Sequence, residues 1–256
     1  MQLISYNLNG IRAAMKKDLP KWIKKTNYDI YCFQETKAHK EQVETEWMDK
    51  LGYHHYWFSA EKKGYSSVAV LSKVKPKNVI YGMGNKTFDA EGRNLLLEFD
   101  NFALLNVYFP SGSSGDHRQE MKFKFLKAFM PYVKKLKKKY GNLIICGDYN
   151  IAHTEIDIHN PKSNKNSSGF LPVEREWMTK FFKAGFIDTF RYFHKDEPHN
   201  YSWWSFRANS RANNKGWRID YFSVSEAMEN RLVAADILPK VKHSDHCPLY
   251  LKIMDK

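Results

Sequence analysis

The feature that most constrains the fold of this chain is a series of short apolar segments, rich in β-branched and aromatic residues, that recurs from one end of the sequence to the other. Such segments are typical of β-strands. We expect strands in QLISYNL, DIYCFQ, SSVAVLS, NLLLEF, FALLNVYF, NLIICGD, YSWWSF, RIDYFSV and PLYLKI. Helical stretches lie between some of them, so the pattern predicts an α/β fold.

Two helices carry recognisable signals. Over 118–140 apolar residues recur at steps of three and four, Asp116 and Gln119 stand like a capping box, and Pro131 predicts a kink or a split. A second helix is expected to begin at Pro172 and to stop at Gly185. With strands near both termini and helices between them, residues 1–256 are predicted to form one domain, in which two sheets pack face to face with helices outside.

Charge restricts the class of partner. Lys and Arg number 41 against 28 Asp and Glu, a net charge of +13. This excess favours a polyanion such as nucleic acid or an anionic membrane, although a solvated basic surface is the plainer alternative. No run of about 18 apolar residues is present, so we expect no membrane span. MQLISYNLNG lacks the features of a secretory signal, which predicts a cytoplasmic protein, nucleoid-associated in a prokaryote.

The three cysteines, Cys32, Cys146 and Cys247, lie in or beside apolar runs. An odd number in such positions predicts reduced core residues rather than a disulfide framework or a zinc site.

Acids, amides, one tyrosine and one histidine fall repeatedly at the ends of the predicted strands. They are Asn7, Asn9, Glu35, Tyr108, Asp148, Asn150, Asp220, Asp245 and His246. Strand ends hold side chains with the rigidity that catalysis needs, so these residues are the candidates for chemistry.

Each candidate has a physical reason and a plainer alternative. Asp148 and Asn150 are two apart, so in an extended segment they would project to one side and orient a water, but both are also ordinary turn residues. Glu35 supplies the hard oxygen that Mg²⁺ prefers, or caps the next helix. His246 can donate to a phosphoryl oxygen if Asp220 holds its ring, with Asp245 on the opposite side facing a metal; alone, it would be a structural histidine.

Two segments rich in Gly, Ser, Asn and Pro, 110–117 and 160–169, are predicted to be loops. Each follows a strand or a motif, so they are either functional loops or plain connections.

Five motifs in this order resemble one family. They are NLNGIRAA (7–14), QETK (34–37), GDYN (147–150), GWRIDYF (216–222) and SDH (244–246), with FLPVEREWM and DTFR (188–191) as supporting segments. Together they resemble the exonuclease III family, the apurinic/apyrimidinic (AP) endonucleases of base excision repair within the endonuclease/exonuclease/phosphatase superfamily.

The resemblance implies a four-layer α/β sandwich of two packed, mainly antiparallel sheets flanked by helices. It also implies a Mg²⁺-dependent phosphodiesterase, with Mn²⁺ able to substitute. The expected substrate is double-stranded DNA, abasic or 3′-damaged, cut 5′ to the abasic site, with 3′-to-5′ exonuclease and 3′-end cleaning as further activities. A monomer that does not bind membranes is expected.

The family's roles are carried over position by position. Glu35 matches the principal Mg²⁺ ligand with Asn7 beside it, and Asp245 matches an acid at a second metal position, which Asp148, Asn150 and His246 would share. Asp148 matches the residue that activates water and Asn150 its partner. His246, paired with Asp220, matches the histidine on the scissile phosphate, Tyr108 an active-site tyrosine, and Trp203, Trp217 and Ile219 the pocket for an extruded abasic sugar.

Two positions depart from the family pattern. Ser111 stands where relatives often carry Asn or Gln, which removes a phosphate contact, and Asn9 stands where some carry Asp, which removes one negative charge near the metal. Two other functions were weighed: a superfamily cousin that cuts a small or lipid phosphoester, which the net charge disfavours, and a DNA-binding module without catalysis, which the intact set of catalytic residues disfavours.

Overall fold

The longest apolar runs of the sequence form the central strands of two six-stranded sheets in the computed structural model of the protein, which describes residues 1–255. The first sheet has, in spatial order, β13 (Leu232–Ile237), β14 (Leu249–Ile253), β1 (Gln2–Asn7), β2 (Ile30–Gln34), β4 (Val68–Ser72) and β3 (His54–Phe58). The second has β5 (Asn78–Tyr81), β6 (Asn94–Glu98), β7 (Ala103–Tyr108), β8 (Leu143–Asp148), β12 (Asp220–Ser225) and β9 (Phe186–Asp188). A separate ribbon pairs β10 (Trp203–Trp204) with β11 (Gly216–Trp217).

Both sheets are mainly antiparallel, and each contains one parallel pair, β1 with β2 and β7 with β8. Buried side chains of both sheets form a shared central core that includes Leu3, Val70, Leu97, Leu104 and Ile144.

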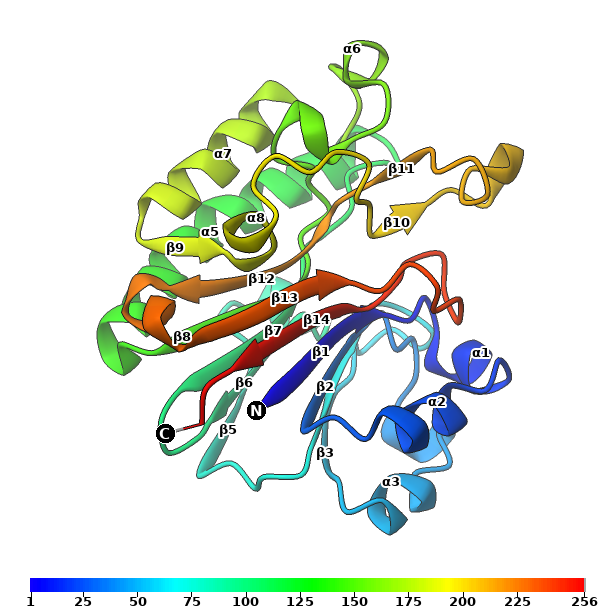
Figure 1. The fold of residues 1–256 in the computed structure, drawn as a ribbon, viewed down its shortest axis with the longest axis vertical. Helices are drawn as coiled ribbons and strands as arrows, with labels where there is room; N and C mark the ends of the chain where they lie inside the picture. The colour runs from blue at the N-terminus through cyan, green and yellow to red at the C-terminus, as the bar shows by residue number, and fades with distance from the viewer. Residues whose placement is uncertain (256) are drawn as a thin grey trace.

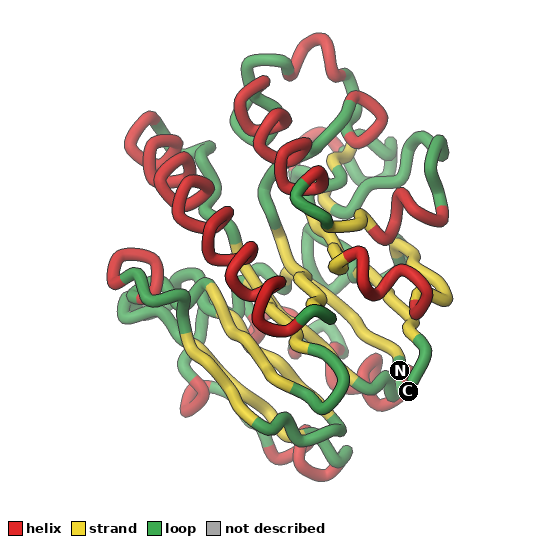
Figure 2. Tube along the Cα trace, turned by 90° about the vertical axis from the view of Figure 1, so that its left-hand side faces the viewer, coloured by secondary structure: helices red, strands yellow, loops and turns green. Residues whose placement is uncertain are grey.

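Helices cover the outer face of each sheet (Figure 1). Buried residues of α1 (Ile11–Met15), α2 (Leu19–Thr26) and α3 (Glu46–Lys50) pack with the first sheet. Those of α5 (Asp116–Tyr140) and α7 (Pro172–Lys183) pack with the second sheet, and Figure 2 shows the long α5 lying across it. The layers are therefore helix, sheet, sheet, helix, which confirms the predicted fold class. That residues 1–256 form a single catalytic domain stays a prediction.

Short helical segments complete the chain. They are α4 (Lys86–Asp89), α6 (Pro161–Asn164), α8 (Thr189–Phe193) and the 3₁₀ turns η1 (Lys40–Gln42), η2 (Glu155–Asp157), η3 (Arg207–Asn209) and η4 (Glu226–Arg231).

The prediction for α5 was wrong at its N-terminus. The helix begins after Gly115 without a side-chain cap, so Asp116 lies in its first turn instead of forming a capping box with Gln119. The helix continues through Pro131 without a split, and the alternative of a kink there stays a prediction. Pro131 and Lys127, whose carbonyl loses its helical partner to the proline, both lie on the exposed face, where water can satisfy that carbonyl.

Other predictions held. Helix α7 begins at Pro172 and ends at Lys183, two residues before Gly185, which has a φ of 91°. All three cysteines are free and buried. Within residues 1–255, no helix is long and apolar enough to cross a membrane.

Candidate active site

The predicted site residues meet because the two parallel pairs end at the same place. Asn7 ends β1 and Glu35 follows β2, while Tyr108 ends β7 and Asp148 ends β8. Parallel neighbours bring their carboxyl ends to one edge of a sheet. Strand β12 runs in the opposite direction and begins at Asp220, which lies directly opposite Asp148 in the pairing register.

These strand ends form one wall of a cavity of about 790 Å³. Among the predicted residues, Glu35, Tyr108, Asp148, Asn150, Trp203, Trp217, Ile219, Asp245 and His246 line it. Asn7 and Asp220 do not line the cavity, but each forms a hydrogen bond with a residue that does. Both segments predicted to be loops also contribute, through Ser111, Gly112, Ser113, Gly115 and Asp116 and through Asn166 to Gly169, although α5 begins at Asp116 and the second segment contains α6.

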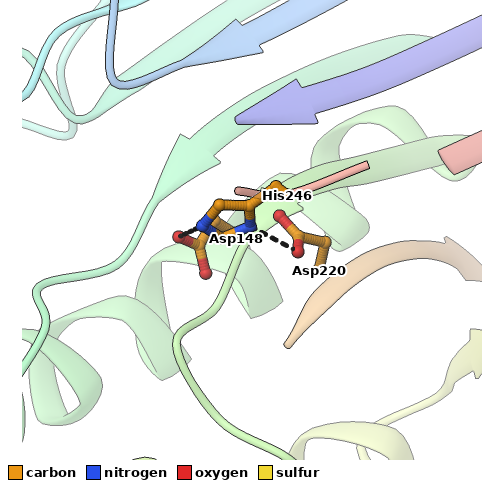
Figure 3. A group of neighbouring side chains, drawn as sticks. All are labelled: Asp148, Asp220 and His246. Atoms are coloured by element: carbon orange, nitrogen blue, oxygen red, sulfur yellow. Dashed lines mark hydrogen bonds and ion pairs between the residues drawn. The ribbon is translucent and has the colours of Figure 1, made fainter. Parts of the chain in front are cut away.

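The imidazole of His246 lies between two carboxylates (Figure 3). Its Nδ1 is 2.9 Å from Oδ2 of Asp220, and its Nε2 is 3.9 Å from Oδ2 of Asp148. The three side chains are 1–5% exposed. Ser202 Oγ also donates to Oδ2 of Asp220 at 2.6 Å, which fixes the carboxylate that orients the ring.

Burial and charge shift the pKa values of this cluster strongly. Burial disfavours the charged form of His246, but the carboxylates of Asp220, Asp148 and Asp245 outweigh it and raise the pKa of His246 to about 10. Burial, followed by repulsion from Asp220, raises the pKa of Asp148 to about 8. The imidazole is therefore favoured as a cation, and Asp148 binds a proton more tightly than an ordinary aspartate does.

Asn150 does not continue strand β8, so of the two alternatives for Asp148 and Asn150 the structure has the turn and not the extended segment. The backbone turns sharply at Asn150, which has a φ of 53°. Its main-chain N–H donates to Oδ1 of Asp148 at 2.8 Å, and its side-chain amide donates to Oδ2 at 3.2 Å. The turn, rather than strand alternation, brings the two side chains together, and an Asx-type turn commonly makes such contacts.

An amide bridge joins the acids of the two sheets. Asn7 Nδ2 donates to Glu35 Oε1 at 3.0 Å and to Asp148 Oδ2 at 2.8 Å, and its oxygen accepts the N–H of Asn9. Lys37 Nζ lies 2.8 Å from Glu35 Oε2. Burial raises the pKa of Glu35, but the opposing effects of Lys37 and Asn7 are larger, so the pKa is lowered overall. This acid is therefore a carboxylate at neutral pH.

The donor set fits a hard divalent cation. Glu35, Asp148 and Asp245 present carboxylate oxygens to one cavity, and no cysteine lines it. Mg²⁺ and Mn²⁺ prefer such oxygens. Asp148, Asp220 and His246 also form a cluster whose candidate ligand atoms lie within 4.8 Å of one another. In this arrangement Asn7 turns its N–H groups, not its oxygen, toward the carboxylates.

Tyr108 completes this side of the cavity. Burial and the nearby Glu35 carboxylate raise the pKa of the Tyr108 phenol, which keeps it neutral and able to donate. The guanidinium of Arg93 lies 4.8 Å from the centre of its ring and donates to the Tyr108 carbonyl at 2.9 Å.

Asp245 accepts hydrogen bonds from the segment that follows β1 and from the β10–β11 ribbon. Its oxygens accept from Asn9 Nδ2 at 3.0 Å and from Trp203 Nε1 at 3.0 Å. Trp203 and Trp217 are neighbours across the ribbon, with ring centres 6.1 Å apart and planes nearly perpendicular. With buried Ile219 they form the apolar wall of the cavity.

Asn9 and Ser111, the two positions that depart from the family pattern, both form hydrogen bonds with neighbouring side chains. Asn9 also accepts from Lys37 Nζ at 2.5 Å, so an amide occupies a place between a lysine and an aspartate. Ser111 lines the cavity, and its hydroxyl is 2.9 Å from that of Ser113.

Sequence reasoning missed a buried ion pair beneath the Asp148–Asn150 turn. Lys122 Nζ lies 2.6 Å from Glu174 Oε1 and donates to the carbonyl of Asn150 at 2.8 Å. Both side chains are fully buried. The signal was present, because Lys122 stands three residues before Phe125 on the apolar face of α5, where a lysine needs a partner.

Comparison with known proteins identifies the family. A model of the Endonuclease/Exonuclease/phosphatase family matches residues 4–246. The sequence is 46% identical over 254 residues to an exodeoxyribonuclease of Bacillus subtilis (strain 168), covering 99% of each chain. It is 40% identical over 253 residues to the DNA repair nuclease APEX1 of Danio rerio, covering 98% of this chain and 81% of that one. The structure matches an AP endonuclease from Archaeoglobus fulgidus with a TM-score of 0.91 and 26% identity over the whole of both chains. The chain therefore belongs to the Endonuclease/Exonuclease/phosphatase family, as a hydrolase of the exodeoxyribonuclease and AP endonuclease type.

Proposed function

We propose that this protein hydrolyses a phosphodiester bond of double-stranded DNA on the 5′ side of an abasic site, with a divalent cation as cofactor. The same site would remove nucleotides from a 3′ end and clean damaged 3′ ends. One observation carries the proposal: a buried Asp148–His246–Asp220 cluster opens into a cavity that has carboxylates on one side and two tryptophans on another.

Asp148 is the proposed base. Its raised pKa gives the carboxylate an affinity for the proton of an attacking water, and three donors from Asn7 and Asn150 hold it in place. A base with a pKa near the working pH combines availability with driving force. Asn150 fixes the orientation of the carboxylate through its turn.

His246 is the proposed donor to the scissile phosphate. Its Nδ1 is held by Asp220, so its Nε2 is the nitrogen free to face a phosphoryl oxygen. Preorganised donors of this kind stabilise the negative charge that grows on that oxygen in the transition state. Tyr108, as a neutral phenol beside Glu35, would supply a second donor.

Glu35 is the proposed principal ligand for Mg²⁺, with Asp148 as its neighbour and Asp245 at a second position. Bound there, the cation supplies positive charge against the phosphoryl oxygens. The direct-ligand role of Asn7 stays a prediction, and its two hydrogen bonds support a role in spacing the Glu35 and Asp148 carboxylates.

The apolar wall supports the choice of an abasic site. Trp203, Trp217 and Ile219 provide a surface against which an extruded, base-less sugar can pack, and a missing base lowers the cost of extrusion. The net charge of +13 supports a duplex polyanion over a small or lipid phosphoester.

The test uses matched duplexes that differ by one abasic-site analogue, incubated with the protein and Mg²⁺. A single cut 5′ to the analogue, leaving a 3′-hydroxyl, supports the proposal, while cutting of the intact duplex at equal rate contradicts it. Duplexes with a recessed 3′-hydroxyl or a 3′-phosphate measure the other two activities. Asp148→Asn, purified in parallel, controls for contaminating nucleases.

A further inference from the structure

One arginine from another segment contacts the loop that carries Asp245 and His246 at four points. Arg211 lies between β10 and β11, and its guanidinium donates to four main-chain carbonyls of the loop 238–248. The acceptors are Ser244 at 2.7 Å, His246 at 3.3 Å, Pro239 at 3.0 Å and Val241 at 2.6 Å.

This loop has no helix or strand of its own to fix it. Within residues 1–255, no main-chain N–H donates to any of these four carbonyls, so the guanidinium is their common partner. A half-buried carbonyl without a donor costs free energy. The hydrogen bonds from Arg211 therefore stabilise the conformation of the loop in which all four carbonyls face the guanidinium.

Arg211 itself packs against the buried side chain of Trp204. Its guanidinium lies 4.6 Å from the centre of the buried Trp204 ring, and Trp204 Nε1 donates to Asn214 Oδ1 at 3.1 Å. The main-chain N–H of Trp204 donates to the Asp245 carbonyl at 3.1 Å. The arginine therefore joins the ribbon that presents Trp203 to the turn that presents Asp245 and His246.

We propose that Arg211 is a positioning residue, which sets the placement of Asp245 and His246 by holding the carbonyls of the loop around them. The inference rests on the proposed function of His246 and Asp245. The contacts of Arg211 with this stretch are to the carbonyls of Ser244 and His246, so the guanidinium acts through the backbone.

Small displacements matter at this point. His246 Nδ1 is 2.9 Å from Asp220, and Asp245 accepts from Trp203 and Asn9 at 3.0 Å. Hydrogen bonds weaken steeply when the donor moves out of line or by a few tenths of an ångström. A loop released from Arg211 would lose these contacts together.

Lysine cannot reproduce the arrangement. The four carbonyls contact two separate nitrogens of one planar guanidinium, and an ammonium has no such fork. Arg211→Lys should therefore keep the charge and part of the contacts but not the placement.

The chain offers a matched control in Arg231. Its guanidinium also donates to two carbonyls, those of Asn101 and Met254, and lies 6.0 Å from the Phe102 ring. Like Arg211, it has a buried Nε for which the described residues provide no partner. It is the last residue of η4, directly before β13, and does not line the catalytic cavity, so its loss tests stability alone.

The experiment compares Arg211→Met and Arg211→Lys with Arg231→Met and Arg231→Lys. Single-turnover cleavage of the abasic duplex, affinity for the uncut duplex without Mg²⁺, and melting temperature are measured for each. Arg211→Met should lower the cleavage rate by about 10- to 100-fold, the usual effect of removing a residue that orients a site ligand, with affinity changed less than about threefold. Arg211→Lys should recover part of the rate, and both Arg231 variants should cleave at the wild-type rate.

A second readout does not depend on activity. The proton on Nδ1 of His246, hydrogen-bonded to Asp220, should give a downfield resonance in the proton spectrum, assigned by its loss in His246→Ala. Arg211→Lys should broaden or shift this resonance, and Arg231→Lys should not. If the wild-type protein cuts no duplex, the proposed function is wrong. The resonance still tests whether Arg211 positions His246, because it does not depend on cleavage.

Three results would overturn the proposal. One is a cleavage rate per folded molecule within twofold of wild type in Arg211→Met. Another is an equal loss of rate in Arg231→Met. If Arg211→Met does not fold, a wild-type rate and an unchanged His246 resonance in Arg211→Lys would overturn it.

Discussion

Asp220 Oδ2 lies 2.9 Å from Nδ1 of His246, at the first residue of β12, directly opposite Asp148 in the neighbouring strand. The pairing register thus sets the distance between the proposed base and the carboxylate that orients the proposed donor. A histidine held in this way presents one defined nitrogen to a substrate.

The first prediction is that Asp220 and His246 act as one unit. His246→Ala should lower kcat by about 10²–10³, the effect of losing one preorganised donor, and Asp220→Asn by a comparable factor. The double variant should lose far less than the product of the two factors, because neither residue stabilises the transition state without the other. Kinetics of the four proteins, all checked for folding, measure this. Purely multiplicative losses would show that the two residues act independently.

The second prediction concerns the cation. Activity should disappear with EDTA and return with Mg²⁺ or Mn²⁺, and Glu35→Gln should raise the Mg²⁺ concentration for half-maximal activity by at least about tenfold. The exposed Glu44→Gln is the control for a lost surface charge. Titration of activity with Mg²⁺, together with melting curves, makes the comparison. Full activity in excess EDTA would exclude the metal-dependent function.

The sequence predicted the central strands but not the edges of the sheets. The edge strands β13, β3, β5 and β9 were all missed. Their residues are mostly half-buried or exposed, so they lack the continuous apolar runs that reveal a strand covered on both faces. An edge strand is defined by its hydrogen bonds to the adjacent strand, and the sequence alone does not show which segments pair.

The site was predictable to the extent that it follows from strand ends. Glu35, Asp148 and His246 stand beside strongly apolar runs, so their positions could be read before their contacts were known. The Asn150 turn, the Lys122–Glu174 pair and the Arg211 contacts depend on partners that are 28 or more residues away or on a positive φ. Periodicity indicates that Lys122 needs a partner and residue type indicates a turn near Asn150, but neither identifies the partners.

The third prediction is a steep salt dependence of duplex binding. Each phosphate neutralised by the protein should contribute about −0.9 to the slope of log affinity against log salt concentration. Binding of the uncut duplex, measured without Mg²⁺ between about 50 and 200 mM salt, should give a slope steeper than about −2. An affinity indifferent to salt over this range would argue for a small uncharged or lipid substrate.

The fourth prediction separates the two contributions of Trp203. Its ring forms part of the apolar wall, and its Nε1 donates to Asp245. Trp203→Ala should lower the preference for abasic over intact duplex by about two- to twelvefold, the effect of losing an aromatic contact of about 0.5–1.5 kcal/mol. Trp203→Phe keeps most of the ring and should retain the preference. A large loss of melting temperature with unchanged preference in Trp203→Ala would instead make the ring a core residue.

The fifth prediction concerns the support behind the cavity wall. Arg218, between Trp217 and Ile219, donates to Oδ1 of Asp157 at 2.7 Å, and Arg191 donates to the same oxygen at 2.7 Å. Asp157 is fully buried. Burial raises the pKa of Asp157, but the two guanidinium groups outweigh it and hold that pKa well below its usual range.

A depressed pKa means that the Asp157 carboxylate stabilises the fold above the pKa of the unfolded chain, about 3.9, and that this stability is lost as the pH falls toward the lower folded-state value. Asp157→Asn removes the carboxylate that Arg218 and Arg191 share, while Arg218 keeps Asp188 at 2.7 Å. Breaking a buried pair in this way costs up to about 3–5 kcal/mol and, for a chain of this size, lowers the melting temperature by up to about 6–20 °C at neutral pH. The difference between wild type and Asp157→Asn should shrink as the pH falls below about 4. Asp100→Asn removes an exposed ion pair with Lys77 and should change the melting temperature little at any pH. A deficit in Asp157→Asn that stayed constant from pH 7 to pH 3 would assign the effect to packing and hydrogen bonding of the side chain, because only the charge of the carboxylate titrates in that interval.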